Sequence, residues 1–177
     1  MIRARSHMNV LLKLTLASAC AAMVVLWPTW RVALQTFGSY QEGPRMTGSG
    51  TCTVGDVKVT HGFELHCDPS DEPNRLEVNW QDETGSHRFY LEDLQTAVCR
   101  DDQGFGERRP VAGFDTYIGT GTGRCDGVSD ADVSWSFTDQ GEPGSNDTLD
   151  IVITGNGDCV MAIMCNLSVG NHQAHRE

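Results

Sequence analysis

The sequence predicts an all-β fold: an antiparallel β-sandwich-like module with disulfides, preceded by an N-terminal hydrophobic leader. Three observations predict it. Apolar and polar residues alternate in short runs between turn residues, segments of helical periodicity are no longer than about two turns, and six cysteines follow the leader. We expect residues 1–30 to be the leader, 31–47 a linker and 48–177 the β-sandwich-like extracellular domain.

The leader starts with basic residues, continues as an apolar run from Leu14 to Trp27 and contains no acidic residue. This order is typical of a secretory signal peptide or of an N-terminal membrane anchor. Residues 17–19 resemble a cleavage site, although cleavage there leaves residues 20–27 on the mature chain, and Cys20 would be the modified residue of a lipoprotein. These alternatives stay open. We expect contact with a membrane only through this segment, if it is uncleaved.

Charge is distributed unevenly along the chain. All 24 acidic residues lie after residue 30, together with ten of the 13 lysines and arginines, so the exported part has a net charge of −14. Such an acidic chain repels phosphate backbones, which argues against nucleic acid as a partner, and it attracts cations. The charge also keeps an exported protein soluble. We therefore expect a secreted or cell-surface protein.

The alternating runs predict about eight strands. In one of them, Val59, Phe63 and Leu65 share a face of the extended chain. Another is expected to bend, because residues 91–94 break its alternation. The few aromatic residues lie inside the runs and are expected in the core. The predicted strands are residues 50–54, 57–67, 74–80, 87–99, 113–121, 131–139, 148–154 and 159–169.

Six motifs follow one another along the domain: VTHGFELHCD, NRLEVNW, RFYLEDL, FDTYIGTGTGR, FTDQGEPGSND and GNHQAH. In this order they resemble an uncharacterised all-β domain of exported bacterial proteins, and the resemblance covers residues 50–175. It implies an extracellular β module from a bacterium and supplies no activity or catalytic residues. It also implies that Cys67 and Cys99 are shared within that family, whereas Cys125, Cys159 and Cys165 are additions in this chain.

Six cysteines behind an export signal predict three disulfides, and no Cys-x-x-Cys spacing points to redox catalysis or a zinc ribbon. Residues 59–67, 74–80 and 87–98 are expected to form a meander, which places Cys67 and Cys99 at one edge. Two strand spacings of a flat sheet are too far for a bridge, but strand ends that curl over the edge can meet. With the shared cysteines of the resembling domains, this favours Cys67–Cys99.

The other four cysteines are paired from an expected hairpin. If residues 131–139 and 147–154 pair around residue 143 or 144, Cys125 and Cys159 flank the open end of that hairpin. The prediction is then Cys125–Cys159, which leaves Cys52–Cys165 by elimination. The alternative of a Cys159–Cys165 bridge with Cys52–Cys125 stays open, because Cys159 and Cys165 are close enough in sequence to meet around a turn.

The stretch FTDQGEPGSND, residues 137–147, has two interpretations. Its glycines, proline and Asx residues are typical of a long hairpin loop. Alternatively, Asp139, Glu142 and Asp147 supply the hard oxygen ligands of a calcium site, although the ligand spacing of an EF-hand is missing. Calcium is therefore the cofactor expected if this stretch is a site, and a turn is the simpler interpretation.

The tail contains a His-x-x-His pair, His172 and His175. On a helix this spacing can chelate a transition metal, but on an extended chain the two rings point to opposite sides. Histidines with an ordinary structural role are the simpler interpretation.

We predict a non-catalytic secreted or cell-surface β module of binding or structural role, whose partner is an unknown surface or cell-wall ligand. The alternative is an extracellular calcium- or transition-metal-binding protein, and a hydrolase comes third. No catalytic residue is proposed, since no pair of acids stands out and Gly-x-Ser-x-Gly is absent. The GTGTG run, residues 119–123, lacks the Lys-Ser/Thr pair of a phosphate-binding loop.

Overall fold

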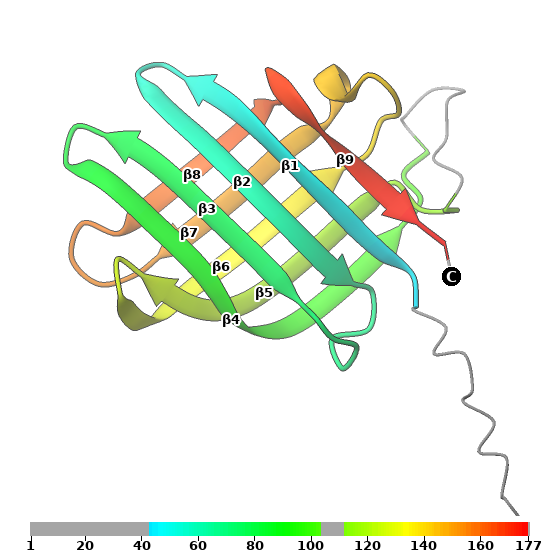
Figure 1. The fold of residues 1–177 in the computed structure, drawn as a ribbon, viewed down its shortest axis with the longest axis horizontal. Coiled ribbons are helices and arrows are strands. Elements are labelled where there is room, and N and C mark those ends of the chain that lie inside the picture. The colour runs from blue at the N-terminus through cyan, green and yellow to red at the C-terminus, as the bar shows by residue number, and fades with distance from the viewer. Residues whose placement is uncertain (1–42, 104–111, 177) are drawn as a thin grey trace, which may run out of the picture. The chain divides into compact units, whose positions relative to one another are not determined.

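The computed structural model describes residues 43–103 and 112–176, which form one nine-stranded antiparallel sheet (Figure 1). This confirms the all-β prediction. In these two stretches, no helix is long and apolar enough to cross a membrane. The elements are β1 Arg45–Val54, β2 Val57–His66, β3 Arg75–Asp82, β4 Gly85–Arg100, β5 Thr116–Cys125, β6 Val128–Thr138, the short 3-10 helix η1 Gly144–Asn146, β7 Thr148–Thr154, β8 Val160–Asn166 and β9 Val169–His175.

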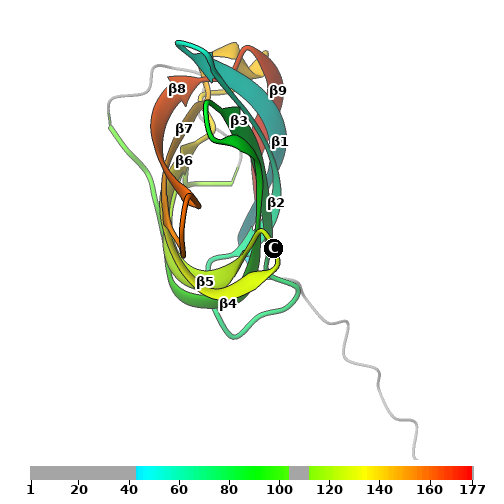
Figure 2. The same cartoon turned by 90° about the vertical axis from the view of Figure 1, so that its left-hand side faces the viewer.

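The sheet curls until its two halves face each other. The strand order is β8-β7-β6-β5-β4-β3-β2-β1-β9. Strands β1 to β8 pair in sequence order, and β9 returns to pair with β1. In Figure 2, β1, β2, β3 and β9 lie in one layer, β6, β7 and β8 lie in the other, and β4 and β5 join the layers at one side. The inward side chains of both layers make the core, which includes Phe63, Phe89, Trp135, Phe137 and Ile151.

Two boundaries differ from the prediction. The domain starts before residue 48, because β1 begins at Arg45 and Met46 is fully buried. The predicted strand 159–169 is divided, because Ser168 donates hydrogen bonds from its backbone N–H and its Oγ to the carbonyl of Thr51. These contacts carry the chain from β8 to the opposite edge of the sheet, where the predicted tail becomes a ninth strand. Residues 31–42 of the predicted linker and the leader lie outside the described residues.

The bend expected in residues 91–94 is present. The pairing of β4 with β5 shifts register between Leu91 and Asp93 and again between Leu94 and Thr96. On β5 the inward positions between Tyr117 and Cys125 are glycines 119, 121 and 123, and a Cβ on any of them would overlap a neighbour from β4 or β6. The GTGTG run therefore lets neighbouring strands and the Trp135 ring approach closely where the sheet turns.

The three disulfides join Cys52 to Cys165, Cys67 to Cys99 and Cys125 to Cys159, which is the pairing predicted from the sequence. Val133 lies opposite Ile153 in the β6–β7 pair, so the hairpin is centred on residue 143 as expected. Cys52–Cys165 links β1 to the edge strand β8 and so ties the two layers together. Three disulfides indicate an oxidising environment.

Candidate functional site

The outer face of β2, β3 and β4 contains two adjoining hollows, which we call the trough. The larger has a volume of about 570 Å³ and the smaller about 420 Å³, and both are lined by Thr60 and Asn79. Inward residues of these strands are buried in the core, so the alternate positions face solvent across the trough. The outward residues that line it are Lys58, Thr60, Gly62, Glu64, Arg75, Glu77, Asn79, Gln81, Ser86, Arg88 and Tyr90.

A fixed polar cluster stands at the centre of the trough. Strand register places Glu77 opposite Tyr90 and Asn79 opposite Arg88. Glu77 Oε1 accepts hydrogen bonds from Arg88 Nε (3.1 Å), Arg88 Nη2 (2.8 Å) and Asn79 Nδ2 (3.0 Å). The guanidinium carbon of Arg88 lies 4.3 Å from the centre of the Tyr90 ring, in a cation–π contact. The Tyr90 ring, 37% exposed, is thus held in place at the surface.

Gly62 forms the floor beside this cluster. It lies opposite Glu77, in the interior of a strand, where glycine costs about 0.5–1 kcal/mol relative to alanine. Its φ is not positive, and a Cβ built there would meet only one atom within 4 Å, the Gly48 carbonyl oxygen at 4.0 Å. Glycines that face the core, such as Gly119, Gly121 and Gly123, differ from Gly62, because protein atoms already fill their Cβ positions. The space above Gly62 therefore has no packing explanation within the described residues, and a ligand that approaches the backbone closely would explain it.

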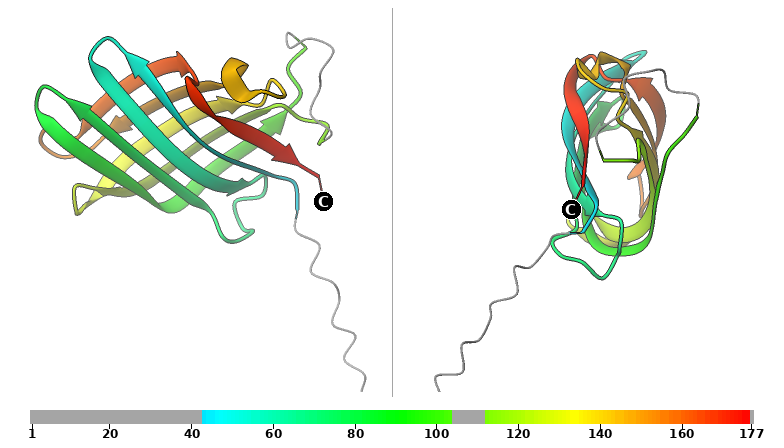
Figure 3. Two further views of the ribbon diagram at one scale, coloured as in Figure 1. Left: turned by 45° about the horizontal axis from the view of Figure 1, so that its top comes forward. Right: turned by 90° about the vertical axis from the view of Figure 1, so that its right-hand side faces the viewer.

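The buried acids of the loop accept hydrogen bonds from backbone N–H groups of the loop and of β9. The carboxylate of Asp139 accepts backbone N–H bonds from Gly141 (2.9 Å) and Ala174 (2.9 Å). The carboxylate of Asp147 accepts backbone N–H bonds from Gln140 (2.8 Å) and His172 (2.7 Å). Both acids are buried, and all four oxygens have a donor. These two carboxylates thus bind the outer edge of β9 in place of a tenth strand, beside η1 (Figure 3).

The structure does not bring the five predicted metal ligands into one cluster. Glu142 accepts a hydrogen bond from Asn171 at the surface, at 2.9 Å. His175 points away from His172 and forms a 2.7 Å hydrogen bond with Thr47. Within the described residues, no three carboxylate, imidazole or thiolate ligand atoms from this set lie within 4.8 Å of one another. Metal binding at the loop or the tail stays a prediction, and the geometry gives these residues other partners.

The burial of Asp147 changes its ionisation. Desolvation, with a smaller contribution from the charges of Asp139 and Glu142, raises the pKa of this carboxyl to about 6. The hydrogen bonds from His172 and Gln140 favour the charged form and oppose the rise. The loop therefore takes up a proton in mildly acidic solution.

A buried pair of histidines, which sequence reasoning missed, lies in the core. His61 Nε2 and His172 Nε2 are 2.7 Å apart, between the rings of Phe63 and Phe137. Burial lowers the pKa of His61 to about 3, with a further contribution from His172, and lowers the pKa of His172 to about 4. Both rings are therefore neutral at physiological pH.

The partners of the two rings assign their tautomers. His172 Nδ1 lies 3.0 Å from the carbonyl oxygen of Thr138, which can only accept, so His172 carries its proton on Nδ1. His172 Nε2 is then an acceptor, and His61 must donate from Nε2. This leaves His61 Nδ1 as a bare acceptor, and it is buried without a partner. Such a pair arranges aromatic packing and hydrogen bonding inside the core.

A Thr-His-Asp arrangement bears on the hydrolase interpretation. His87 Nε2 lies 2.9 Å from Thr84 Oγ1, and His87 Nδ1 lies 2.7 Å from Asp126 Oδ2. Thr84 Oγ1, however, donates its proton to Asp82 Oδ1 at 2.6 Å, so it accepts from His87. The hydrogen bond to Asp126 raises the pKa of His87, and the charges of Asp126 and Asp82 add to the effect. An imidazolium that donates from both nitrogens does not activate Thr84 as a nucleophile.

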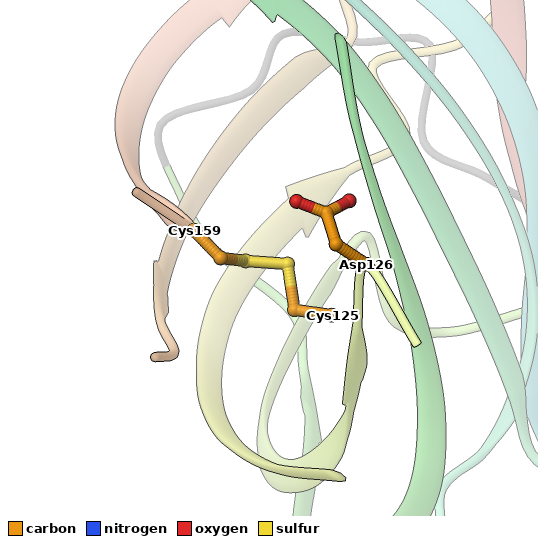
Figure 4. Close-up of side chains that lie close together, drawn as sticks. All are labelled: Cys125, Asp126 and Cys159. Atoms are coloured by element: carbon orange, nitrogen blue, oxygen red, sulfur yellow. A yellow bond between two sulfur atoms is a disulfide. The ribbon is translucent and has the colours of Figure 1, made fainter. Parts of the chain in front are cut away.

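Asp126 also lies beside two sulfur atoms (Figure 4). Its carboxylate and the sulfurs of Cys125 and Cys159 are within 4.8 Å of one another. The sulfurs are bonded to each other, so neither is a thiolate, and Asp126 accepts hydrogen bonds from His87 and from the backbone N–H of Arg88. This group is a disulfide next to a turn.

No protein-family model, curated protein or solved structure matches this chain. The assignment of a site therefore rests on the geometry given above. Of the groups described, only the trough combines open space, exposed polar side chains and a surface aromatic ring.

Proposed function

We propose that the protein is a non-catalytic secreted or cell-surface module that binds a surface or cell-wall glycan in the trough. The three disulfides and the expected leader support an extracellular location. The resemblance to β domains of exported bacterial proteins agrees with this.

The chemistry of the trough favours a polyhydroxylated ligand. Asn79, Gln81, Thr60 and Ser86 offer amide and hydroxyl groups that both donate and accept hydrogen bonds. The Tyr90 ring offers an apolar surface against which the C–H face of a sugar ring can stack. Because Glu77 already orients Asn79 and Arg88, the ordering of these side chains costs little when a ligand binds.

The observation that carries the proposal is the open space above Gly62. Filling it is a test that leaves the fold intact, because a Cβ built there meets no atom closer than 4.0 Å and β-branched residues favour strands. Gly62→Val should therefore fold at least as well as the wild type while it obstructs the trough.

The experiment is affinity electrophoresis of the folded, oxidised domain through gels that contain a panel of soluble cell-wall and capsular polysaccharides. We expect retention of the wild type by at least one polymer, without cleavage of that polymer. Gly62→Val and Tyr90→Ala should each weaken binding about tenfold or more. Ser134→Val, a matched change on the exposed face of β6, should bind like the wild type. Retention of Gly62→Val equal to wild type, or no retention by any polymer, would overturn the proposal.

A further inference from the structure

We infer that the glycan bound in the trough is anionic, a polymer that carries carboxylate or sulfate groups. This inference rests on the proposed function and adds the charge of the ligand. The trough is lined by three cations, Lys58, Arg75 and Arg88, and two anions, Glu64 and Glu77. A lining with an excess of cations stands out in a chain whose formal net charge is −11.

The pairing of the cations points the same way. Four of the arginines in the described residues have an acidic partner within 4 Å, and only one of these four lines the trough. Lys58 and Arg75 both line it, and neither forms an ion pair with any residue of the two described stretches. The paired residues are Arg45 with Glu64, Arg88 with Glu77, Arg100 with Asp102 and Arg124 with Glu92.

The spacing of the three cations suits an extended polymer. In the strand register, Arg75 on β3 lies opposite Glu64 on β2, and Glu64 is six residues from Lys58 along β2. The two cations therefore lie at opposite ends of a path of about 20 Å. Arg88 lies between them, opposite Asn79 and fixed by Glu77. A single small anion would reach one of these cations, whereas a chain with charges on successive sugars reaches all three.

The rest of the sheet guides such a polymer to the trough. Strands β6, β7, β8 and β9 contain no lysine or arginine, and β6 and β7 place Asp130, Asp132 and Asp150 on the outer face. An acidic polymer is repelled there and attracted to β2–β4, which fixes where it binds and speeds encounter at low salt.

The test uses polymers matched in everything but charge: polygalacturonate with its methyl ester, carboxymethyl cellulose with hydroxyethyl cellulose, and dextran sulfate with dextran. We expect one acidic polymer to bind at least tenfold more tightly than its neutral counterpart, and 0.5 M salt to weaken that binding about tenfold or more. The double variant Lys58→Gln, Arg75→Gln should lose about tenfold or more in affinity. Arg100→Gln with Arg176→Gln removes equal charge outside the trough and should not.

The outcomes separate the two claims. Equal, salt-insensitive binding of a neutral polymer that Gly62→Val abolishes would overturn the charge inference and leave the proposed function standing. No binding of any of the six polymers, or binding that Gly62→Val leaves unchanged, would overturn both. Stronger binding of single-stranded DNA than of every glycan would overturn the inference in favour of a nucleic-acid ligand.

Discussion

The His61–His172 pair shows how a single buried contact makes stability depend on pH. Each ring is neutral in the folded protein, and protonation of either ring leaves a charge among aromatic side chains without an anionic partner. The carboxyl of Asp147 accepts the backbone N–H of His172, and its pKa is raised. Its protonation in mild acid therefore favours the folded state, which opposes the effect of the two histidines. The balance of these three groups contributes to the stability of the fold in mild acid.

We predict that the free energy of unfolding falls as the pH decreases from 6.5 to about 4. The histidines have folded pKa values of about 3 and about 4, so their stabilisation is complete above 6.5 and is lost as the pH falls towards those values. Asp147, with a folded pKa of about 6, adds stability over the same range. For these three groups, unfolding then takes up about one net proton between pH 6 and pH 4, a slope of about 1.4 kcal/mol per pH unit.

Urea denaturation at several pH values measures this slope. Asp147→Asn removes the opposing group, so its slope should approach about 2.7 kcal/mol per pH unit, for two net protons. A free energy of unfolding that is constant or rises from pH 6.5 to pH 4 would contradict the neutral pair.

At the scale of single residues, the sequence predicts which side chains face the core better than it predicts which of them contact each other. The alternation of residues 57–67 places His61 on the core face, but its partner is 111 residues away. That contact exists only because β9 crosses to β1, and the GNHQAH segment has little apolar alternation to announce a strand. The open space above Gly62 is equally hidden, since it depends on the neighbours that the register of three strands supplies.

Among the elements, β9 depends most on side chains outside the sheet. It pairs with β1 on one side only, and on the other side its backbone donors are met by Asp139 and Asp147. The loop of residues 139–147 therefore connects β6 to β7 and also binds the free edge of β9, a role we call the clamp. This role accounts for the buried carboxylates of Asp139 and Asp147 without a bound ion.

We predict that Asp147→Ala costs about 2–4 kcal/mol in the free energy of unfolding, because the N–H groups of Gln140 and His172 lose their acceptor. Hydrogen exchange at the His172 amide should accelerate strongly. The control Glu142→Gln keeps an oxygen for Asn171 at the surface and should change stability by less than about 0.5 kcal/mol. An Asp147→Ala protein of wild-type stability with a protected His172 amide would show that the clamp is unimportant.

Calcium provides an independent check on the loop. Since all four oxygens of Asp139 and Asp147 accept backbone N–H groups, we expect the same melting temperature with millimolar calcium and with a chelator. A rise with calcium that Asp139→Ala with Asp147→Ala abolishes would instead support the calcium site considered from the sequence.

The strands themselves could largely be predicted. Residues 57–67 and 74–80 alternate clearly, residues 87–99 alternate except at 91–94, and β2, β3 and β4 occupy nearly the same residues. The start of β1 was missed because residues 45–50 are mostly small and polar, with Met46 as the one large apolar residue facing the core. Edge strands are specified by their partners as much as by their own pattern.

For the whole molecule, the curl of the sheet and the disulfides hold the two layers together. Cys52–Cys165 closes a separation of 113 residues, which stabilises the fold by about 4–5 kcal/mol in the chain-entropy model. With the layers joined in this way, β2–β4 can use their outward positions for polar side chains and a glycine. Hairpin register predicts Cys125–Cys159, whereas Cys67–Cys99 rests also on the resemblance and Cys52–Cys165 follows by elimination, with Cys159–Cys165 as the open alternative. The trough could not be predicted, because it is a property of the assembled surface.

The central claim is that ligand binds on the outer face of β2–β4, and amide chemical-shift mapping tests it most directly. The ¹⁵N-labelled, oxidised domain is titrated to saturation with a fragment of the best-retained polysaccharide. The account predicts the largest shifts at Gly62, Asn79 and Tyr90, with β6–β8 unchanged. Saturable shifts confined to β6–β8 or to the loop of residues 139–147 would contradict it.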